Sequence, residues 1–225
     1  MAEVPVEALK ERAWREVAAI DAALARGDID EAGWHAANQA LVVPAYLRAD
    51  TPWGQSGAGG DAARWEAKRR ILLRAVDRDG DLLDIGCANG YLMQTLHAWA
   101  AEDGTAVEPY GLDLSPGLAA LARRRLPHWA DRIWVGNALH WLPPRRFDYV
   151  RTGLEYVPRH RRADLLRHLL EHAVGRRLVV GVHTEEIGQR ALEEEVASYG
   201  YAVAGRHETA HDDPRVARRL FWIDA

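Results

Sequence analysis

The stretch Asp81-Leu82-Leu83-Asp84-Ile85-Gly86-Cys87-Ala88-Asn89-Gly90-Tyr91-Leu92 decides the fold of this 225-residue chain. Its apolar residues are typical of a short strand that is buried on both faces of a parallel sheet. A loop of small residues follows, and from Leu92 onward the apolar spacing becomes helical. A strand, a glycine-containing turn and a helix bring backbone N–H groups and a helix N-terminus beside a ligand. The stretch therefore predicts a ligand-binding loop at the edge of an α/β sheet.

A second buried strand, near residues 109–113, also ends in an acid, Asp113. In folds of this kind, an acid at that place accepts hydrogen bonds from both hydroxyls of a ribose. The pair of strand ends therefore predicts a nucleoside-binding site.

The spacing of small residues indicates which nucleoside binds. A dinucleotide fingerprint needs glycine at three positions, which here are occupied by Gly86, Ala88 and Tyr91. Ala88 would crowd a pyrophosphate, and Tyr91 would block the close contact between helix and strand. The charge of Asp84 is unfavourable for phosphates but suits a cationic ligand. These features disfavour a nicotinamide-dependent oxidoreductase, which we keep only as the last alternative.

The pattern Asp84-x-Gly86-x-Ala88-x-Gly90 resembles motif I of the class I S-adenosylmethionine-dependent methyltransferases, whose usual form is acid-x-Gly-x-Gly-x-Gly. The resemblance continues through residues 111–115, 135–139 and 147–158, in the order and spacing of the family. It covers roughly residues 60–205. The resemblance implies that the cofactor is S-adenosylmethionine.

The resemblance also implies roles for individual residues. Asp84 would lie near the ammonium end of the cofactor, and Asn137 would face the adenine amino group. Asp113 would bind the ribose, although it could instead cap the helix beginning near Pro116, a role that Ser115 could fill. The expected cofactor contacts are Asp84, Gly86, Ala88, Gly90, Asp113, Leu114, Asn137, Ala138 and Thr152.

Catalytic groups are expected at the carboxyl ends of the strands, where open α/β sheets bind ligands. A methyl group on a sulfonium is already activated, so transfer needs mainly positioning and exclusion of water. A hydroxyl acceptor also benefits from a base, and Glu155 and His183 are the two candidates. Glu155 could instead be a carboxylate at a helix start, and His183 could be an ordinary loop histidine.

Aromatic residues are candidates for binding the acceptor. Tyr46 and Trp53 lie near a glycine-rich loop that could close over the site, while Trp141 and Tyr156 follow two of the expected strands. Such rings can stack on a planar molecule or enclose a cation. The alternative is that the tryptophans anchor helices to the sheet.

Residues 1–60 are expected to form a helical extension that ends in the glycine-rich lid. Gly27 should end the first helix, and Asp28 with Glu31 suggests a capping box for a second helix that runs to about Leu41. Asp61 should cap the next helix, which is expected to run to about residue 76.

Residues 61–225 are expected to form the methyltransferase domain. The fold class is α/β: a Rossmann-like, doubly wound sheet of seven strands whose last strand is antiparallel. The strands are expected near residues 81–85, 109–113, 132–135, 147–152, 177–183, 200–206 and 218–224. The last two should pair as an antiparallel hairpin.

Composition narrows the partners. The net charge of −4 disfavours bulk attraction to nucleic acid or to an anionic membrane. Neither a signal peptide nor an apolar run of about 20 residues is visible, and the single cysteine fits a reducing cytoplasm. The motif His168-Leu-Leu-Glu-His172 matches a zinc-peptidase pattern, but its leucines indicate a sheet-packing helix, so no metal is expected.

We therefore expect a cytoplasmic enzyme that transfers a methyl group from S-adenosylmethionine to oxygen or nitrogen of a small molecule. The alternative is a protein of the same fold that binds the cofactor without catalysis, as a sensor or partner protein. Basic clusters such as residues 123–125 leave RNA binding as a minor alternative. The sequence leaves open whether the protein is a monomer or a homodimer.

Overall fold

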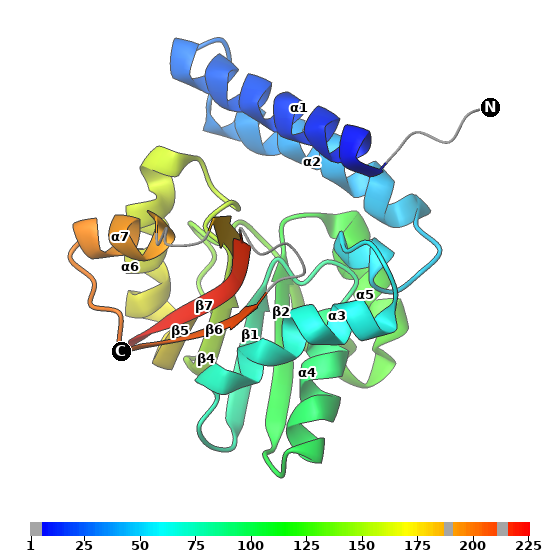
Figure 1. Ribbon diagram of the computed structural model, residues 1–225, viewed down its shortest axis with the longest axis vertical. Coiled ribbons are helices and arrows are strands. Elements are labelled where there is room, and N and C mark those ends of the chain that lie inside the picture. The colour runs from blue at the N-terminus through cyan, green and yellow to red at the C-terminus, as the bar shows by residue number, and fades with distance from the viewer. Residues whose placement is uncertain (1–5, 187–190, 211–215) are drawn as a thin grey trace. The chain divides into compact units, whose positions relative to one another are not determined.

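The computed structural model describes residues 6–186, 191–210 and 216–225, and Figure 1 shows the arrangement of their elements. The chain divides into two compact units, residues 1–45 and 46–225. The glycine-rich loop therefore belongs to the same unit as the sheet. Within the described ranges, no helix combines the length and the apolarity that crossing a bilayer requires.

The first unit is an antiparallel helix pair, α1 (Val6–Arg26) and α2 (Glu31–Arg48), whose last turn enters the second unit. Gly27 ends α1 with a left-handed φ of +78°, as predicted. The capping-box prediction is wrong. Asp30 caps α2 by accepting the Gly33 N–H at 2.7 Å, whereas Asp28 pairs with Arg26 at 2.8 Å.

The prediction that the second helix ends near Leu41 is also wrong. Helix α2 continues to Arg48 and contains Pro44. A proline inside a helix removes one N–H donor and opposes the helical bonding of the preceding turn. The helix nevertheless continues, and Tyr46 belongs to its last turn. Tyr46 is also the first residue of the second unit.

The second unit is built on the seven-stranded sheet that the sequence predicts, in the order β3-β2-β1-β4-β5-β7-β6. The pairs among the first five strands are parallel, and β7 is antiparallel to both β5 and β6. The strands are β1 (Gly80–Ile85), β2 (Val107–Asp113), β3 (Ile133–Val135), β4 (Phe147–Thr152), β5 (Val174–Glu186), β6 (Gly205–Ala210) and β7 (Val216–Asp224).

Strand β1 lies between β2 and β4, so the winding of the chain reverses at β1. Open parallel sheets bind ligands at the carboxyl ends of the strands beside such a reversal. The predicted loop at residues 86–90 lies at that place. The predicted hairpin is confirmed, but its first strand spans Gly205–Ala210 rather than residues 200–206.

Helices cover both faces of the sheet. The longer helices are α3 (Ala62–Arg69), α4 (Tyr91–Glu102), α5 (Pro116–Arg125), α6 (Arg162–His172) and α7 (Ala191–Ser198). The short 3₁₀ helices are η1 (Gly54–Ser56), η2 (Arg70–Ala75), η3 (Pro127–Arg132) and η4 (Arg159–Arg161). Asp61 caps α3 as predicted, accepting the Arg64 N–H at 2.8 Å, but the helix becomes the 3₁₀ helix η2 after Arg69.

Side chains of β1 alternate between two apolar clusters. Leu83 and Ile85 pack in the cluster that includes residues of α6 and α7. Leu82 packs in the cluster that includes Trp65 of α3, η2 and α4. Because side chains alternate along a strand, Asp84 faces the same side as Leu82. Asp84 therefore points to the face of the sheet that α3 covers.

Candidate functional site

The loop after β1 is held in an unusual backbone conformation. Gly86, Ala88 and Gly90 all have left-handed φ angles, of +75°, +48° and +73°. Ala88 is the one non-glycine residue of the described chain with a positive φ. For a residue with a β-carbon this conformation costs about 1–2 kcal/mol. Strain of this kind is typical of functional loops.

Asp113, at the end of β2, fixes this loop. Its Oδ2 accepts the Ala88 N–H at 2.8 Å, and its Oδ1 accepts the Ser115 N–H at 2.8 Å. Burial raises the pKa of Asp113, and these two N–H groups oppose that change. Ser115, not Asp113, caps α5, by accepting the Leu118 N–H at 3.3 Å. The helix-cap alternative for Asp113 is therefore wrong.

Asp84 is 1% exposed and pairs with a buried arginine, Arg151 of β4. Arg151 Nη1 donates to Asp84 Oδ1 at 3.2 Å, to the Ile85 carbonyl at 3.3 Å and to the Tyr156 hydroxyl at 2.8 Å. Its Nε donates to the Gly181 carbonyl at 3.1 Å. Asp84 Oδ2 is buried and has no hydrogen-bond partner among the described residues. This oxygen can accept a hydrogen bond from a ligand.

Tyr156 lies directly against Gly86. A β-carbon on Gly86 would come within 2.7 Å of Tyr156 Cζ, so only glycine allows this approach. Burial raises the pKa of the Tyr156 hydroxyl well above its ordinary value, although Arg151 acts in the opposite direction. Tyr156 is therefore protonated at neutral pH and serves as a neutral hydrogen-bonding group.

A second arginine approaches the same cluster. Arg69, at the end of α3, places its guanidinium over the ring of Trp65, 5.3 Å from the centroid. Burial lowers the pKa of Arg69, and the positive charge of Arg151 lowers it further, whereas Asp84 and Glu155 raise it. Within the described part of the chain, Arg69 forms no ion pair or hydrogen bond through its side chain. Its guanidinium can bind an anion.

Glu155 and Tyr46 complete this cluster. Glu155 is exposed, and its carboxylate folds back over Gly153, where it would clash with an added β-carbon. Because α6 begins at Arg162, Glu155 does not lie at a helix start, and that alternative is wrong. Burial raises the pKa of Tyr46, which also senses the charges of Arg69, Glu155 and Asp113. Tyr46 therefore lies within electrostatic range of both the glutamate and the β2 aspartate.

Asn89 connects the loop after β1 to the glycine-rich segment. It is fully buried, and its Nδ2 donates to the Pro52 carbonyl at 2.9 Å and to Gln55 Oε1 at 3.2 Å. Its Oδ1 accepts from Ser56 Oγ at 2.5 Å and from the Tyr91 N–H at 3.0 Å. The amide thus uses two donors and two acceptors. Residues 52–56 are thereby fastened to the loop.

Other predicted contacts lie around the carboxyl ends of the strands. Leu114 is half-buried, and Ala138 is buried. Asn137 Oδ1 accepts the Leu139 N–H at 3.0 Å, which fixes the turn after β3. Thr152 is fully buried, and its hydroxyl donates to the Gly153 carbonyl at 3.1 Å. These four roles in cofactor binding stay predictions.

For the remaining three predicted residues, the structure describes two aromatic contacts and one backbone position. Trp53 packs against Tyr91, with the ring centroids 6.4 Å apart. Trp141 packs against Trp134 at 5.3 Å. For His183 the structure describes only the backbone, which pairs with Arg219 beside an irregularity in β5, and its side chain lies outside the described residues. The roles of all three stay predictions.

Sequence reasoning missed Asn89, Arg69 and Arg151. Arg151 carries a signal, because a charged residue inside a buried strand needs a partner, and Asp84 is the matching charge on a neighbouring strand. Within the motif that matches a zinc-peptidase pattern, His168 Nε2 lies 2.9 Å from the Trp141 carbonyl. Among the described residues, no three His, Cys, Asp or Glu side chains are grouped to hold a metal ion.

Comparison with known proteins agrees with the predicted fold. Residues 82–174 match the family model described as a methyltransferase domain. The N-methyltransferase NodS from Bradyrhizobium japonicum WM9, in complex with S-adenosyl-L-homocysteine, matches with a TM-score of 0.58 at 16% identity, over 81% of this chain and 95% of that one. A search of curated proteins finds no match.

Two further structures are similar. The 1,6-didemethyltoxoflavin-N1-methyltransferase from Burkholderia thailandensis, with bound 1,6-didemethyltoxoflavin and S-adenosylhomocysteine, has a TM-score of 0.60 at 16% identity, over 87% and 90% of the two chains. Magnesium protoporphyrin IX methyltransferase from Synechocystis PCC 6803, with bound SAM, has a TM-score of 0.52 at 16% identity, over 76% and 88%.

At these identities the structural matches establish the fold, and the family match covers residues 82–174, less than half of the chain. The matched range starts inside β1 and runs through the loop of residues 86–90, the end of β2 and the end of β4. Over residues 82–174 the chain is similar to the methyltransferase-domain family, and its sheet has the Rossmann-like fold of these methyltransferase structures.

Proposed function

We propose that this protein transfers a methyl group from S-adenosylmethionine to an oxygen or nitrogen atom of a small molecule. The observation that carries the proposal is a pair of unsatisfied charged groups beside the loop of residues 86–90. Asp84 Oδ2 is buried without a hydrogen-bond donor, and Arg69 has no acceptor among the described residues. An amino-acid end, with one ammonium and one carboxylate, complements both groups.

The adjacent strand ends suit the rest of the cofactor. The buried carboxylate of Asp113 lies at the end of β2. In addition to its two backbone N–H partners, it can accept hydrogen bonds from ribose hydroxyls. Leu114 and Ala138 would contact the faces of the adenine, and Asn137 its edge. Arg151 already compensates the charge of Asp84. The site therefore accommodates a zwitterionic amino-acid end better than a ligand group that carries only a positive charge.

When bound, the cofactor supplies a methyl group on a positively charged sulfur, already activated for in-line displacement by an oxygen or nitrogen lone pair. The protein's task is then to orient the acceptor and exclude water. The Tyr156 hydroxyl contacts Arg151 at 2.8 Å, and Tyr46 lies within electrostatic range of Glu155. Glu155 is exposed, and it is our candidate to take the proton that an O–H or N–H acceptor loses.

A small-molecule acceptor is supported by two observations. The net charge of −4 opposes binding to a polyanion. The Burkholderia thailandensis structure, which shares the fold, contains the small molecule 1,6-didemethyltoxoflavin. The acceptor itself is to be identified by a screen for methyl transfer.

Calorimetric titration tests the cofactor assignment. We expect S-adenosylmethionine and S-adenosylhomocysteine to bind with roughly micromolar Kd, and NAD not to bind. 5′-Methylthioadenosine, which lacks the amino-acid end, should bind at least about tenfold more weakly than S-adenosylhomocysteine. Arg69→Gln should reduce that difference, whereas Arg64→Gln, an exposed residue of the same helix, should preserve it. Binding of NAD but of neither sulfur nucleoside would contradict the proposal.

A further inference from the structure

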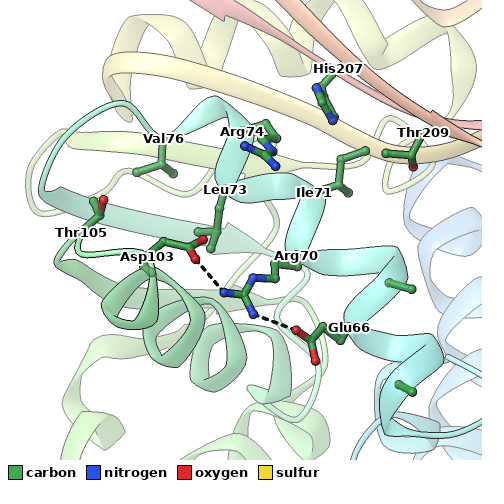
Figure 2. A pocket seen from close by; sticks show the side chains of 13 residues that line it. Glu66, Arg70, Ile71, Leu73, Arg74, Val76, Asp103, Thr105, His207 and Thr209 are labelled. Atoms are coloured by element: carbon green, nitrogen blue, oxygen red, sulfur yellow. Dashed lines mark hydrogen bonds and ion pairs between the residues drawn. The ribbon is translucent and has the colours of Figure 1, made fainter.

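A second pocket lies away from the cofactor cluster. Its volume is about 750 Å³, and Figure 2 shows the side chains that line it. Its walls come from α3 and η2, from the end of α4 with the turn that follows, and from β6. It shares no residue with the loop of residues 86–90 or with the ends of β1, β2 and β4. Pockets that hold small molecules commonly have volumes of about 300–1,000 Å³.

One side of the pocket is an internally satisfied ion-pair network. Arg70 contacts Glu66 at 2.8 Å, Glu102 at 2.9 Å and Asp103 at 2.7 Å. Three carboxylates against one guanidinium leave two net negative charges there. Figure 2 shows Glu66, Arg70 and Asp103 joined across this side. The excess of negative charge on this side repels multiply charged anions.

The other side carries polar groups without partners. Arg74 and His207 form no hydrogen bond or ion pair through their side chains in the described part of the chain. Thr209 Oγ1 is buried and lacks a hydrogen-bond partner among the described residues. A buried hydroxyl without a partner is costly, so a ligand that forms a hydrogen bond with it would be stabilised there. Figure 2 shows these three residues along the same side of the pocket.

We propose that this pocket is a second ligand site, which binds a small monocarboxylate with an apolar body. Arg74 would hold the carboxylate, because a guanidinium matches its two oxygens. Ile71, Leu73 and Val76 line the pocket and would cover the apolar body. The acidic side disfavours phosphate, which carries more charge. This assignment is independent of the proposed methyl transfer.

Ligand-observed NMR tests this proposal by titrating the full-length protein with hexanoate and benzoate. Hexanamide, benzamide and inorganic phosphate are titrated for comparison. We expect both carboxylates to bind at least about tenfold more tightly than their amides and than phosphate. Arg74→Gln should weaken carboxylate binding by a similar factor. Arg124→Gln, an exposed arginine of α5 outside the pocket, should leave it unchanged. Ala67→Trp should abolish binding by filling the pocket.

A carboxylate could also bind to Arg69, so two further experiments distinguish binding in this pocket from binding at Arg69. Binding in the second pocket should persist in Arg69→Gln and in the presence of saturating S-adenosylhomocysteine. Binding that is lost in Arg69→Gln but kept in Arg74→Gln would overturn the proposal. It would also be overturned by equal binding of acids and amides, by a preference for phosphate, or by the absence of carboxylate binding. Thermal unfolding of each variant confirms that it is folded.

Discussion

Asp113 holds the loop after β1 and the start of α5 together through one carboxylate. Asp113→Asn removes the charge and leaves one oxygen to accept where two accepted before. We expect S-adenosylhomocysteine affinity to fall by at least about tenfold, the loss of a charged hydrogen bond. Calorimetry measures this, with Asp131→Asn at an exposed position as the control. Unchanged affinity in a folded variant would remove Asp113 from the site.

We propose Glu155 as the residue that takes a proton from the acceptor. Glu155→Gln keeps the shape of the side chain but cannot accept a proton. With a hydroxyl acceptor, turnover should fall by about 10²–10⁴, while the Kd for S-adenosylhomocysteine stays unchanged. Steady-state kinetics and calorimetry measure the two quantities, and Glu194→Gln, exposed on α7, is the control. Wild-type turnover in Glu155→Gln would exclude it as the base.

Individual site residues could be predicted where they belong to a sequence motif, but not where they meet only through the fold. Gly86, Ala88 and Gly90 follow one strand, so their pattern is visible without a structure. The Arg69 guanidinium and the Asp84 carboxylate come from different elements, and their proximity depends on which face of β1 points toward α3. Register across the sheet decides that Arg151 lies beside Asp84, and a pattern within one strand cannot supply the register.

At the scale of elements, Asn89 joins the glycine-rich segment to the loop after β1. Asn89→Asp is nearly isosteric but loses both donors, so the Pro52 carbonyl and Gln55 Oε1 would face a carboxylate. We expect faster amide hydrogen exchange over residues 49–60 and weaker binding of S-adenosylhomocysteine. Ser56→Ala removes one of the four hydrogen bonds and should have a smaller effect.

Ser198→Ala is the matched control, because Ser198 forms a local hydrogen bond to the Glu195 carbonyl far from this segment in sequence. Exchange mass spectrometry resolves the change by segment. Equal exchange over residues 49–60 in wild type and Asn89→Asp would show that Asn89 does not position the segment.

Asp77 connects the end of η2 to β4 and β5. Arg176 Nε donates to it at 2.9 Å, the Tyr149 hydroxyl at 2.7 Å, and Arg177 lies at 3.1 Å. The bond from Arg176 holds the pKa of Asp77 well below its ordinary value, despite partial burial. The pKa of an aspartate in the unfolded chain is about 3.9. Because the pKa of Asp77 is lower in the folded protein, its ionisation stabilises the fold at pH values above about 3.9. This contribution is lost as the pH falls from there through the folded pKa.

Asp77→Asn should therefore lower the free energy of unfolding at pH 7, and its difference from wild type should shrink below about pH 4. Because a third of the Asp77 side chain is exposed, we expect an effect of about 1 kcal/mol or less. Urea unfolding at pH 7, 5 and 3.5 measures it, with Asp131→Asn as control. A difference that stays constant over this range would show that Asp77 ionisation is not linked to folding.

Elements with strong apolar patterns were predicted well, and their ends less so. The fourth strand, at residues 147–152, is bounded by buried residues and agrees with the structure. The sixth strand alternates half-buried and exposed residues along its length, so no apolar run marks its start at Gly205. Helix α2 passes through Pro44 although local propensity favours an end there. Tertiary packing overrides local preference at such places.

At the scale of the whole molecule, the class of fold was predictable because four motifs recur in a fixed order along one sheet. The order of the strands follows from that class, with β1 between β2 and β4 and β7 inserted between β5 and β6. The division of the chain at residues 45 and 46 does not follow from the motifs. It depends on how densely each segment contacts the rest, which composition alone does not encode.

This division makes a prediction about the molecule as a whole. Every described residue that we assign to the cofactor site lies in residues 46–225, beginning with Arg69. A fragment of residues 46–225 should therefore unfold cooperatively and bind S-adenosylhomocysteine within about threefold of the full-length Kd, roughly 0.7 kcal/mol. Thermal unfolding and calorimetry measure both quantities. The Kd of the full-length Asp113→Asn variant, which should fold but bind weakly, provides the reference value for a damaged cofactor site. A folded fragment that binds as weakly as this reference would mean that residues 1–45 contribute to the cofactor site, and the site would then have to be redrawn to include α1 or α2.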